Sequence, residues 1–408
     1  MRRLSRRSDL TFKANLQNGR HGWLRLTPAY AATLVEDLLQ DVAIQSVVLD
    51  PFAGTGTTGL VCAEKGLQCD MVEINPFLAW LASVKVCCYT ASEAKRTLHL
   101  AQEVLALCEG DSPLLPQRVP PMRNIERWWT PPRLVTLSRL YEAIHTVCQS
   151  EPTKITDLLL VAFCQVLIRW SNAGYHHPSV TFRVIEPSLF PHEEASLILT
   201  DFINSVSNIC ASAVKPLRGK VEVFTDDART LGCLEGRTYD MVITSPPYPN
   251  RISYVREVRP FLYWLGFLKT PREAGELDWQ AIGGTWGAAT SRLLDIELNN
   301  NELYAMLPEL QIIVGTIDRR SPLLSRYVVR YFQDMYTHLQ HLSRLLKKGA
   351  CIRYIVGNAK FYDVIVPTEQ LLAHLMQEVG IEQLRIEPLR KRNSKKELVE
   401  FLISGIKL

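Results

Sequence analysis

The sequence of 408 residues lacks the features that define several large classes of protein. Its ten cysteines form no CxxC pair, which argues against a zinc ribbon or a thioredoxin-like motif and favours free thiols in a reducing compartment. The longest apolar segment, residues 158–168, is interrupted by Gln165 and is shorter than the roughly 18 residues that a membrane span needs. The basic start lacks the apolar stretch of a signal peptide. These absences predict a cytoplasmic protein without a membrane partner.

The net charge of the chain is also small, because 46 Lys and Arg against 42 Asp and Glu leave only +4. The total therefore says little about nucleic-acid binding, but the distribution is uneven. Residues 1–26 carry seven basic side chains and one acidic side chain, Asp9. Such a basic arm can follow phosphates by electrostatic attraction. A solvated, disordered tail would have the same composition, so charge alone leaves both interpretations open.

The remaining composition, 47% hydrophobic and 22% charged, is that of a globular protein without internal repeats or low-complexity runs. Three stretches alternate strand and helix patterns, over about 47–86, 221–248 and 327–408. The third predicts a helix that ends at Lys347-Lys348-Gly349, a second helix capped by Thr368, and a terminal hairpin. We therefore expect an α/β fold with one mostly parallel sheet, interrupted by helical insertions.

The segments between these stretches lack strand alternation, and residues 91–218 have mostly helical patterns. Trp128-Trp129 is expected to anchor the core of that insertion. His176-His177 has no third ligand at metal-site spacing, so we predict no metal site. The predicted division is a basic N-terminal arm (1–26), a first part of the core (27–90), a helical insertion (91–218), a second part of the core (219–250), a second insertion (251–329) and a third part of the core (330–408).

The first motif that carries chemistry is Asp50-Pro51-Phe52-Ala53-Gly54-Thr55-Gly56-Thr57-Thr58, which follows a predicted strand and opens a helix. Glycines at such a bend let a ligand approach the backbone, and the free N–H groups at the helix start favour a carboxylate. Glu73 ends the next strand, where a carboxylate can accept both hydroxyls of a ribose. The pattern predicts a nucleoside site. It does not predict a triphosphate site, because GxxxxGK[ST] is absent.

The second motif is Ser245-Pro246-Pro247-Tyr248, at the end of the buried strand predicted for 239–244. Two prolines stiffen the loop and offer carbonyls without neighbouring N–H donors. These oxygens and the serine hydroxyl can accept the hydrogens of an exocyclic amine while the aromatic ring stacks on a planar base. A proline pair after a strand is by itself more often a plain turn, so this interpretation depends on the glycine motif.

The two motifs together resemble the cofactor and catalytic motifs of the amino-directed DNA methyltransferases, which use S-adenosyl-L-methionine. Serine before Pro-Pro-Tyr is similar to the N4-cytosine branch, whereas N6-adenine members more often carry Asp or Asn. About half of the chain shares the resemblance. The further similar segments are His21 to Tyr30 (methionine end of the cofactor), Asp227-Ala228-Arg229 (adenine amine), Gly357-Asn358 with Val366-Pro367-Thr368 (pocket wall) and Arg392 to Phe401 (terminal strands).

The resemblance implies a Rossmann-like S-adenosylmethionine-dependent methyltransferase fold with a C-terminal antiparallel hairpin, and residue roles within it. The implied catalytic residues are Ser245, Pro246, Pro247 and Tyr248. The implied cofactor-binding residues are Thr27, Asp50, Pro51, Phe52, Gly54, Gly56, Thr57, Thr58, Glu73, Asn75, Asp227 and Ala228. The candidate DNA contacts are Arg251, Tyr254, Arg256 and Arg259. Phe261 and Trp264 are expected in the helix core instead, and Tyr254 fits either role.

The function that the resemblance implies is site-specific methylation of the exocyclic N4 amine of a flipped cytosine in double-stranded DNA. A restriction–modification or defence system is the expected setting, nucleoid-associated through DNA, with a cognate restriction endonuclease as a candidate partner. The insertion 91–218 is expected to read the bases, with residues 251–330 as a second candidate for DNA contacts. The alternatives are N6-adenine methylation of DNA, methylation of RNA, and an inactive cofactor-binding scaffold. The C5-cytosine route is set aside because no Pro-Cys dipeptide exists in the chain. The methylation hypotheses need residues 50–58 and 245–248 side by side at one sheet edge.

Overall fold

A computed structural model of the chain describes residues 5, 7–26, 29–109, 118–174, 181–183, 191–250, 253–284, 292–298, 300–392 and 397–408. Two of the predicted site residues, Thr27 and Arg251, lie outside these ranges. The same holds for the paired histidines of the first insertion and for part of the N-terminal basic segment.

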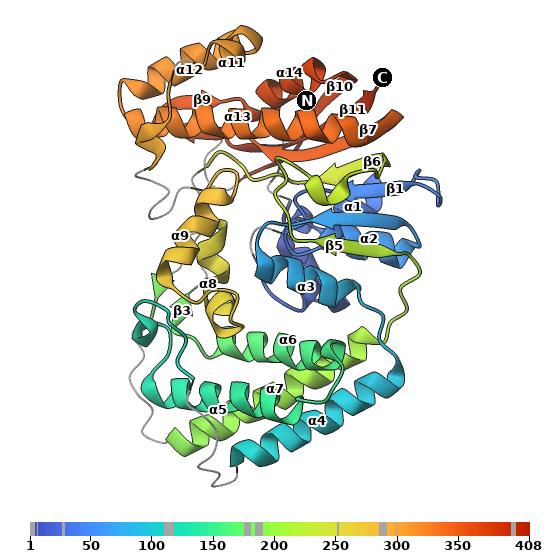
Figure 1. The fold of residues 1–408 in the computed structure, drawn as a ribbon, viewed down its shortest axis with the longest axis vertical. Coiled ribbons are helices and arrows are strands. Elements are labelled where there is room, and N and C mark those ends of the chain that lie inside the picture. The colour runs from blue at the N-terminus through green and yellow to red at the C-terminus, as the bar shows by residue number, and fades with distance from the viewer. Residues whose placement is uncertain are drawn as a thin grey trace.

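A seven-stranded sheet forms the centre of the molecule, in the order β10-β11-β7-β6-β1-β2-β5 (Figure 1). The five strands from β7 to β5 run parallel, and β11 pairs antiparallel with both β7 and β10. This arrangement confirms the predicted Rossmann-like methyltransferase fold with a terminal hairpin. The strands of the sheet are β1 (Val47–Asp50), β2 (Gln68–Val72), β5 (Val221–Phe224), β6 (Tyr239–Thr244), β7 (Leu346–Gly357), β10 (Ile381–Lys391) and β11 (Val399–Lys407).

Two small ribbons and thirteen described α-helices surround this sheet. The ribbons pair β3 (Ala173–Gly174) with β4 (Thr181–Phe182), and β8 (Ala359–Phe361) with β9 (Val364–Val366). The helices are α1 (Ala32–Leu38), α2 (Thr57–Lys65), α3 (Pro76–Val86), α4 (Ala91–Glu109), α5 (Pro131–Val147), α6 (Thr153–Arg169), α7 (Pro191–Ala213), α8 (Tyr254–Trp264), α9 (Pro271–Gln280), α11 (Asn301–Met306), α12 (Pro308–Asp318), α13 (Pro322–Leu345) and α14 (Thr368–Glu378).

The central strands separate two hydrophobic cores, because successive side chains of a strand point to opposite faces of the sheet. Val48 and Ile243 lie in the core that includes α1 and α2. Leu49 and Val242 lie in the core that includes α13 and α14. Helices therefore cover both faces, which is why β1 and β6 consist almost entirely of buried residues.

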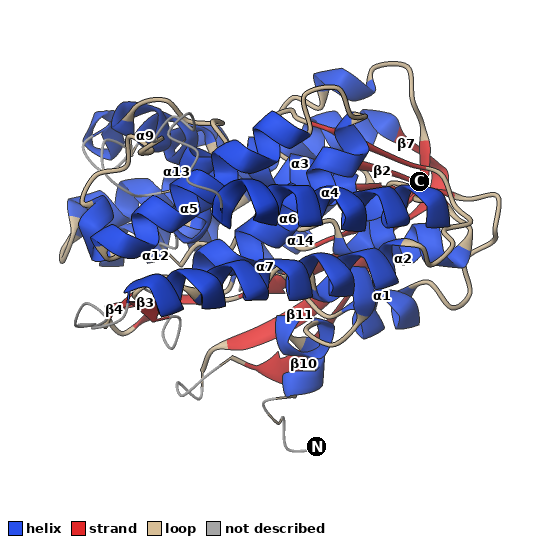
Figure 2. Cartoon of the chain, turned by 90° about the horizontal axis from the view of Figure 1, so that it is seen from below, coloured by secondary structure: helices blue, strands red, loops and turns tan. Residues whose placement is uncertain are grey.

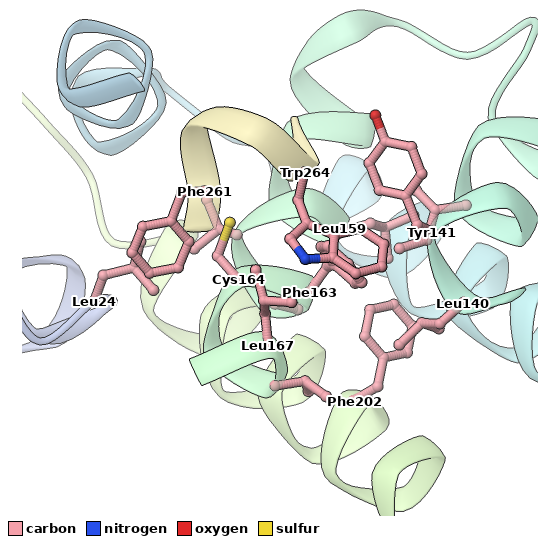
Figure 3. Close-up of a cluster of buried hydrophobic side chains, with 14 of the residues drawn as sticks. Leu24, Leu140, Tyr141, Leu159, Phe163, Cys164, Leu167, Phe202, Phe261 and Trp264 are labelled. Atoms are coloured by element: carbon pink, nitrogen blue, oxygen red, sulfur yellow. The ribbon is translucent and has the colours of Figure 1, made fainter. Parts of the chain in front are cut away.

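A third core holds the predicted helical insertion together. Helices α4 to α7 lie side by side at the end of the molecule away from α11 to α14 (Figures 1 and 2). Trp264 of α8 enters this core, with its ring 5.4 Å from that of Phe163 (Figure 3). The same ring lies 5.9 Å from that of Trp129. Phe261, one turn earlier, stacks on Phe77 of α3 at 4.7 Å. The predicted core roles of Phe261, Trp264 and Trp129 are confirmed, and α8 of the second insertion shares the core of the first.

The structure corrects three local predictions in the C-terminal part. Helix α13 begins at Pro322, so the predicted boundary at 329/330 falls inside it. The helix ends at Leu345, and Lys347-Lys348-Gly349 belong to β7, where a register irregularity against β6 accommodates the left-handed backbone of Gly349. Thr368 is the first residue of α14 rather than its cap, and its hydroxyl donates to the Val366 carbonyl at 3.3 Å.

The described part of the N-terminal segment packs against the rest of the chain, although its basic side chains differ, since Arg7, Lys13 and Arg25 are exposed and Arg20 is buried. Trp23 and Leu24 lie in the third core. Arg20 is only 3% exposed, and its guanidinium donates to the backbone carbonyls of Lys85 at 2.7 Å and Cys87 at 2.6 Å. A guanidinium used in this way is not available to a phosphate. In the described ranges, no helix has the length and apolarity to cross a membrane.

Candidate active site

The glycine turn and the proline loop lie side by side at one edge of the sheet. They follow β1 and β6, which are parallel neighbours with Val48 opposite Met241 and Leu49 opposite Val242. The hydroxyl of Thr244, the last residue of β6, donates to Asp50 Oδ1 at 2.6 Å, so the two strand ends are bonded directly. The chain proceeds from β1 to β2 on one side, while β6 lies on the other. Ligands of open α/β sheets bind at such a point.

The glycine turn needs glycine at two positions for two different reasons. Both residues have left-handed backbones, with φ of +52° at Gly54 and +78° at Gly56. A Cβ on Gly56 would lie 2.8 Å from the Cβ of Ala82, so this glycine lets α2 and α3 approach each other. A Cβ on Gly54 would meet no atom within 4 Å. Gly54 therefore faces open space, where a ligand can reach the backbone.

Asp50 lies beneath the turn and holds it rather than facing that space. It is fully buried and accepts hydrogen bonds from the Tyr30 hydroxyl at 3.2 Å and the Phe52 N–H at 3.2 Å, in addition to Thr244. Burial raises the pKa of Asp50, whereas these donors oppose the rise. Tyr30 also contacts the hydroxyl of Thr58, which is itself buried. Asp50 and Thr58 therefore shape the turn from within.

Glu73 and Asn75 form the corner beside the turn. Glu73 accepts the N–H of Gly54 and the N–H of Asn75, both at 2.8 Å. Burial raises the pKa of Glu73 to about 7. Asn75 Oδ1 caps α3 by accepting the Phe77 N–H at 3.1 Å, while its buried Nδ2 has no partner among the residues described. A carboxylate and an unpaired amide donor in one corner suit the polar edge of a nucleoside.

The segment after β5 forms a wall near Phe52. Asp227 is held by Arg229, whose Nη2 lies 2.6 Å from Oδ2. The carbonyl of Ala228 accepts from His338 Nδ1 at 2.6 Å, and His338 Nε2 accepts from the Tyr354 hydroxyl at 2.7 Å. Burial lowers the pKa of His338 to about 4, so the ring is neutral and its Nδ1 carries the hydrogen. The Phe52 ring packs edge-on against His338, with centroids 4.7 Å apart.

A buried lysine supports the glycine turn from the other side. Lys85 of α3 is 1% exposed and donates from Nζ to the Thr55 carbonyl at 3.1 Å. Burial lowers the pKa of Lys85 to about 7. Asn15, His21, Leu26 and Thr55 line a small cavity between the N-terminal segment and the turn. The signal for Lys85 in the sequence is a single lysine within the apolar run of α3, which helical patterning alone does not distinguish from a surface lysine.

The proline loop is fixed by three distant elements. Ser245 Oγ donates to the Ile355 carbonyl of β7 at 3.1 Å, which leaves its lone pairs to accept other hydrogens. The Tyr331 hydroxyl of α13 donates to the Pro247 carbonyl at 2.9 Å. The Tyr248 N–H donates to the Tyr254 hydroxyl of α8 at 3.2 Å. Tyr331 and Ile355 carry no motif, so the sequence did not indicate them.

The candidate DNA contacts have mixed surroundings. Tyr254 is directed to the proline loop, as its bond to Tyr248 shows. Arg259 is partly buried, which lowers its pKa, and its Nε has no partner among the residues described. Arg256 follows the cap Ser253, whose hydroxyl accepts its N–H at 3.2 Å. Within the described ranges, no cluster of three potential metal ligands occurs.

Comparison with known proteins agrees with the geometry. No family model matches the chain. It is 23% identical over 429 residues to the Type II methyltransferase M.AvaI of Nostoc sp., covering 96% of this chain and 86% of that protein. It is 21% identical to the Type II methyltransferase M.BsoBI of Geobacillus stearothermophilus, covering 97% and 85%. The Type II methyltransferase M.MvaI of Kocuria varians is 19% identical, covering 82% and 75%. These relatives are all named Type II methyltransferases, which agrees with the resemblance to the amino-directed DNA methyltransferases that the motifs indicate.

Solved structures similar to this methyltransferase are more distant. TrmN from Thermus thermophilus has a TM-score of 0.32 at 10% identity, covering 98% of this chain and 53% of that chain. The rRNA methyltransferase aviRa from Streptomyces viridochromogenes has a TM-score of 0.30 at 12% identity, covering 96% and 92%. The methyl donor is S-adenosyl-L-methionine. The open space at Gly54, the carboxylate of Glu73 and the unpaired amide of Asn75 fit this cofactor.

Proposed function

We propose that this methyltransferase transfers a methyl group to the exocyclic N4 amine of a cytosine flipped out of double-stranded DNA, at a specific sequence. The observation that carries the proposal is the direct junction of the two motifs through Thr244 and Asp50. A methyl donor bound at the glycine turn and a target amine bound at the proline loop would lie next to each other. That proximity provides much of the rate in a direct transfer.

The choice of DNA and of a restriction–modification setting is supported by the relatives, which are named Type II methyltransferases over nearly the whole chain. The choice of cytosine N4 over adenine N6 is supported by Ser245, which stands where adenine-directed members more often have Asp or Asn. A target base must leave the helix to reach such a loop, at a cost of a few kcal/mol. The insertion 91–218 is proposed to read the bases.

The proline loop would activate the amine by accepting its hydrogens. An aromatic amine is a weak nucleophile because its lone pair is delocalised into the ring. Ser245 Oγ donates its own hydrogen to the Ile355 carbonyl, so its lone pairs can accept one hydrogen of the amine. The Pro246 carbonyl would accept the second hydrogen of the amine. Tyr248 would stack on the base. These preset dipoles localise the lone pair on nitrogen without reorganising during the reaction.

The turn side of the site would hold S-adenosyl-L-methionine through Glu73, Asn75 and the backbone at Gly54, with Asp227 and Phe52 beside them. When bound, the cofactor supplies an electrophilic methyl group. The transfer would join this methyl carbon to the cytosine nitrogen while the carbon–sulfur bond of the sulfonium breaks and leaves a neutral thioether. The nitrogen would then lose one hydrogen as a proton to water. The residues of the chain bind and orient the reactants, and no covalent enzyme intermediate is needed.

Incubation with tritium-labelled S-adenosyl-L-methionine and mixed-sequence duplex DNA tests the proposal, with digestion of the DNA to nucleosides. We expect label in N4-methylcytosine and none with Ser245→Ala. Label in N6-methyladenine would replace the base assignment and keep the DNA substrate. Label on RNA or protein but not on DNA would overturn the proposal. Sequencing of DNA from cells that express the chain would show the modified sequence.

A further inference from the structure

The side chain of Tyr248 is held by the C-terminal hairpin, at a site that neither motif predicts. Its hydroxyl donates to Glu400 Oε1 at 3.0 Å, across 152 positions of sequence. Glu400 lies on β11 and is only 5% exposed. The phenol therefore has a buried carboxylate acceptor, in addition to a longer contact of 3.4 Å with Ser245 Oγ.

Glu400 is itself immobilised by an ion pair within the hairpin. Arg390 of β10 donates to it twice, from Nε to Oε2 at 2.6 Å and from Nη2 to Oε1 at 2.9 Å. The two residues face each other across the antiparallel strands. A two-point guanidinium–carboxylate contact fixes orientation as well as distance. Oε1 thus receives both Arg390 and Tyr248, and it cannot rotate away from the phenol without breaking the pair.

The Tyr248 ring is confined in the same way. The guanidinium of Arg392 lies 4.8 Å from the ring centroid and donates to the Asn358 carbonyl at 2.9 Å. A Cβ on Gly357 would lie 2.8 Å from two ring carbons, so glycine is needed for the ring to fit. Asn358 holds the hairpin in place, because its side chain bonds the Glu397 carbonyl and the Val399 N–H, both at 2.9 Å.

We propose that Glu400 is a positioning residue that sets the orientation of the Tyr248 ring for stacking on the target base, supported by Arg390 and Arg392. The inference rests on the proposed function. A tyrosine ring has two rotatable bonds, and a stacking platform is effective only when its plane is set before the base arrives. The phenol hydroxyl also lies 3.4 Å from Ser245 Oγ, while its hydrogen is donated to Glu400. Its bond to Glu400 explains why the loop ends in tyrosine rather than phenylalanine.

The test compares Glu400→Ala, Tyr248→Phe, their combination and Glu400→Gln in the full chain. Glu397→Ala is the matched control, because Glu397 belongs to the same hairpin and pairs with Lys360 at 2.6 Å without touching Tyr248. We expect kcat on DNA to fall about tenfold in Glu400→Ala and in Tyr248→Phe, the usual loss of a bond to a charged group. We expect no change in cofactor Kd, no further loss in the double variant, and partial recovery in Glu400→Gln.

A general loss of protein stability would have different effects. It would also weaken cofactor binding, and the losses of the two single variants would add in the double variant. Additive losses of kcat, or a control that falls as far as Glu400→Ala, would overturn the inference. A double-mutant cycle on the free energy of urea unfolding measures the Tyr248–Glu400 contact without an activity assay. Additive changes in the free energy of unfolding would also overturn the inference. A wild-type protein that binds the cofactor but labels no DNA would instead overturn the proposed function and, with it, this role of Glu400.

Discussion

The two halves of the site are built in different ways. The glycine turn is supported largely by residues close to it in sequence, such as Glu73 on the next strand and Lys85 on the next helix. The proline loop is supported by Tyr331, Ile355 and Glu400, which come from the last quarter of the chain. The proline loop, to which we assign catalysis, therefore depends on the correct docking of the C-terminal part, which reaches the proposed cofactor side through the contact of His338 with Phe52.

The largest effect is expected when the catalytic half alone is changed. Ser245→Ala removes one acceptor for the amine, and we expect kcat to fall about 10²- to 10³-fold, as when one preorganised group at a reacting atom is lost. Cofactor Kd, measured by calorimetry, should stay within twofold. A comparable loss of cofactor affinity would break the distinction between the two halves.

Gly54 and Gly56 of the glycine turn should respond differently to substitution by alanine. Gly56→Ala should lower the free energy of unfolding by about 2–4 kcal/mol, because backbone strain adds to the close approach of Ala82. Gly54→Ala has open space, so only strain of about 1–2 kcal/mol is expected. Urea unfolding measures both, and calorimetry should show weaker cofactor binding in Gly54→Ala. Equal stability losses would contradict the different roles assigned to the two positions.

The ionisation of Glu73 provides a pH test of cofactor binding. Its pKa is raised to about 7, so the carboxylate that we propose as the acceptor of the ribose hydroxyls is mostly protonated at pH 6 and mostly ionised at pH 8. We expect cofactor affinity to rise about tenfold over this range, since binding then needs the ionised form. Calorimetric titration at several pH values measures the rise. Glu73→Gln should bind more weakly and without this dependence, and a persisting pH dependence would assign it to another group.

The smallest expected effect concerns Lys85 and stability. Its pKa falls from 10.5 in the unfolded chain to about 7 in the folded protein, so between these values the unfolded state binds more protons. Stability relative to Lys85→Met should therefore rise with pH through this window, by about 1 kcal/mol from pH 7 to pH 8. Urea unfolding at both pH values measures it. Lys65→Met, at the exposed end of α2, should show no such change relative to wild type.

The sequence was sufficient to predict the parts of the site that local pattern determines. The strand before Asp50 and the strand before Ser245 followed from apolar runs that end in glycine or proline motifs, and their adjacency followed from the resemblance to the methyltransferases. The supports of Tyr248 could not be predicted in this way. Glu400 and Arg390 look like ordinary alternating residues of a terminal hairpin, and only the register of β10, β11 and β7 brings them to the loop.

The errors have a similar origin. Arg20 was grouped with a basic arm because local charge does not show that carbonyls of Lys85 and Cys87 surround it. The Lys347-Lys348-Gly349 triplet has the composition of a helix end, yet it lies within β7, at the register irregularity against β6. In both cases a contact between distant segments outweighs the local preference of the sequence.

Helix α8 connects the proline loop to the core of the helical insertion. It starts at Tyr254, which holds the proline loop, and ends at Trp264 inside the core of the helical insertion (Figure 3). A chimera that exchanges residues 91–218 with those of a relative would therefore retain Trp264, whose indole would have to pack among helices that do not match it. Transplanting α8 together with the insertion would keep that fit, at the expense of rebuilding the junction with Tyr248.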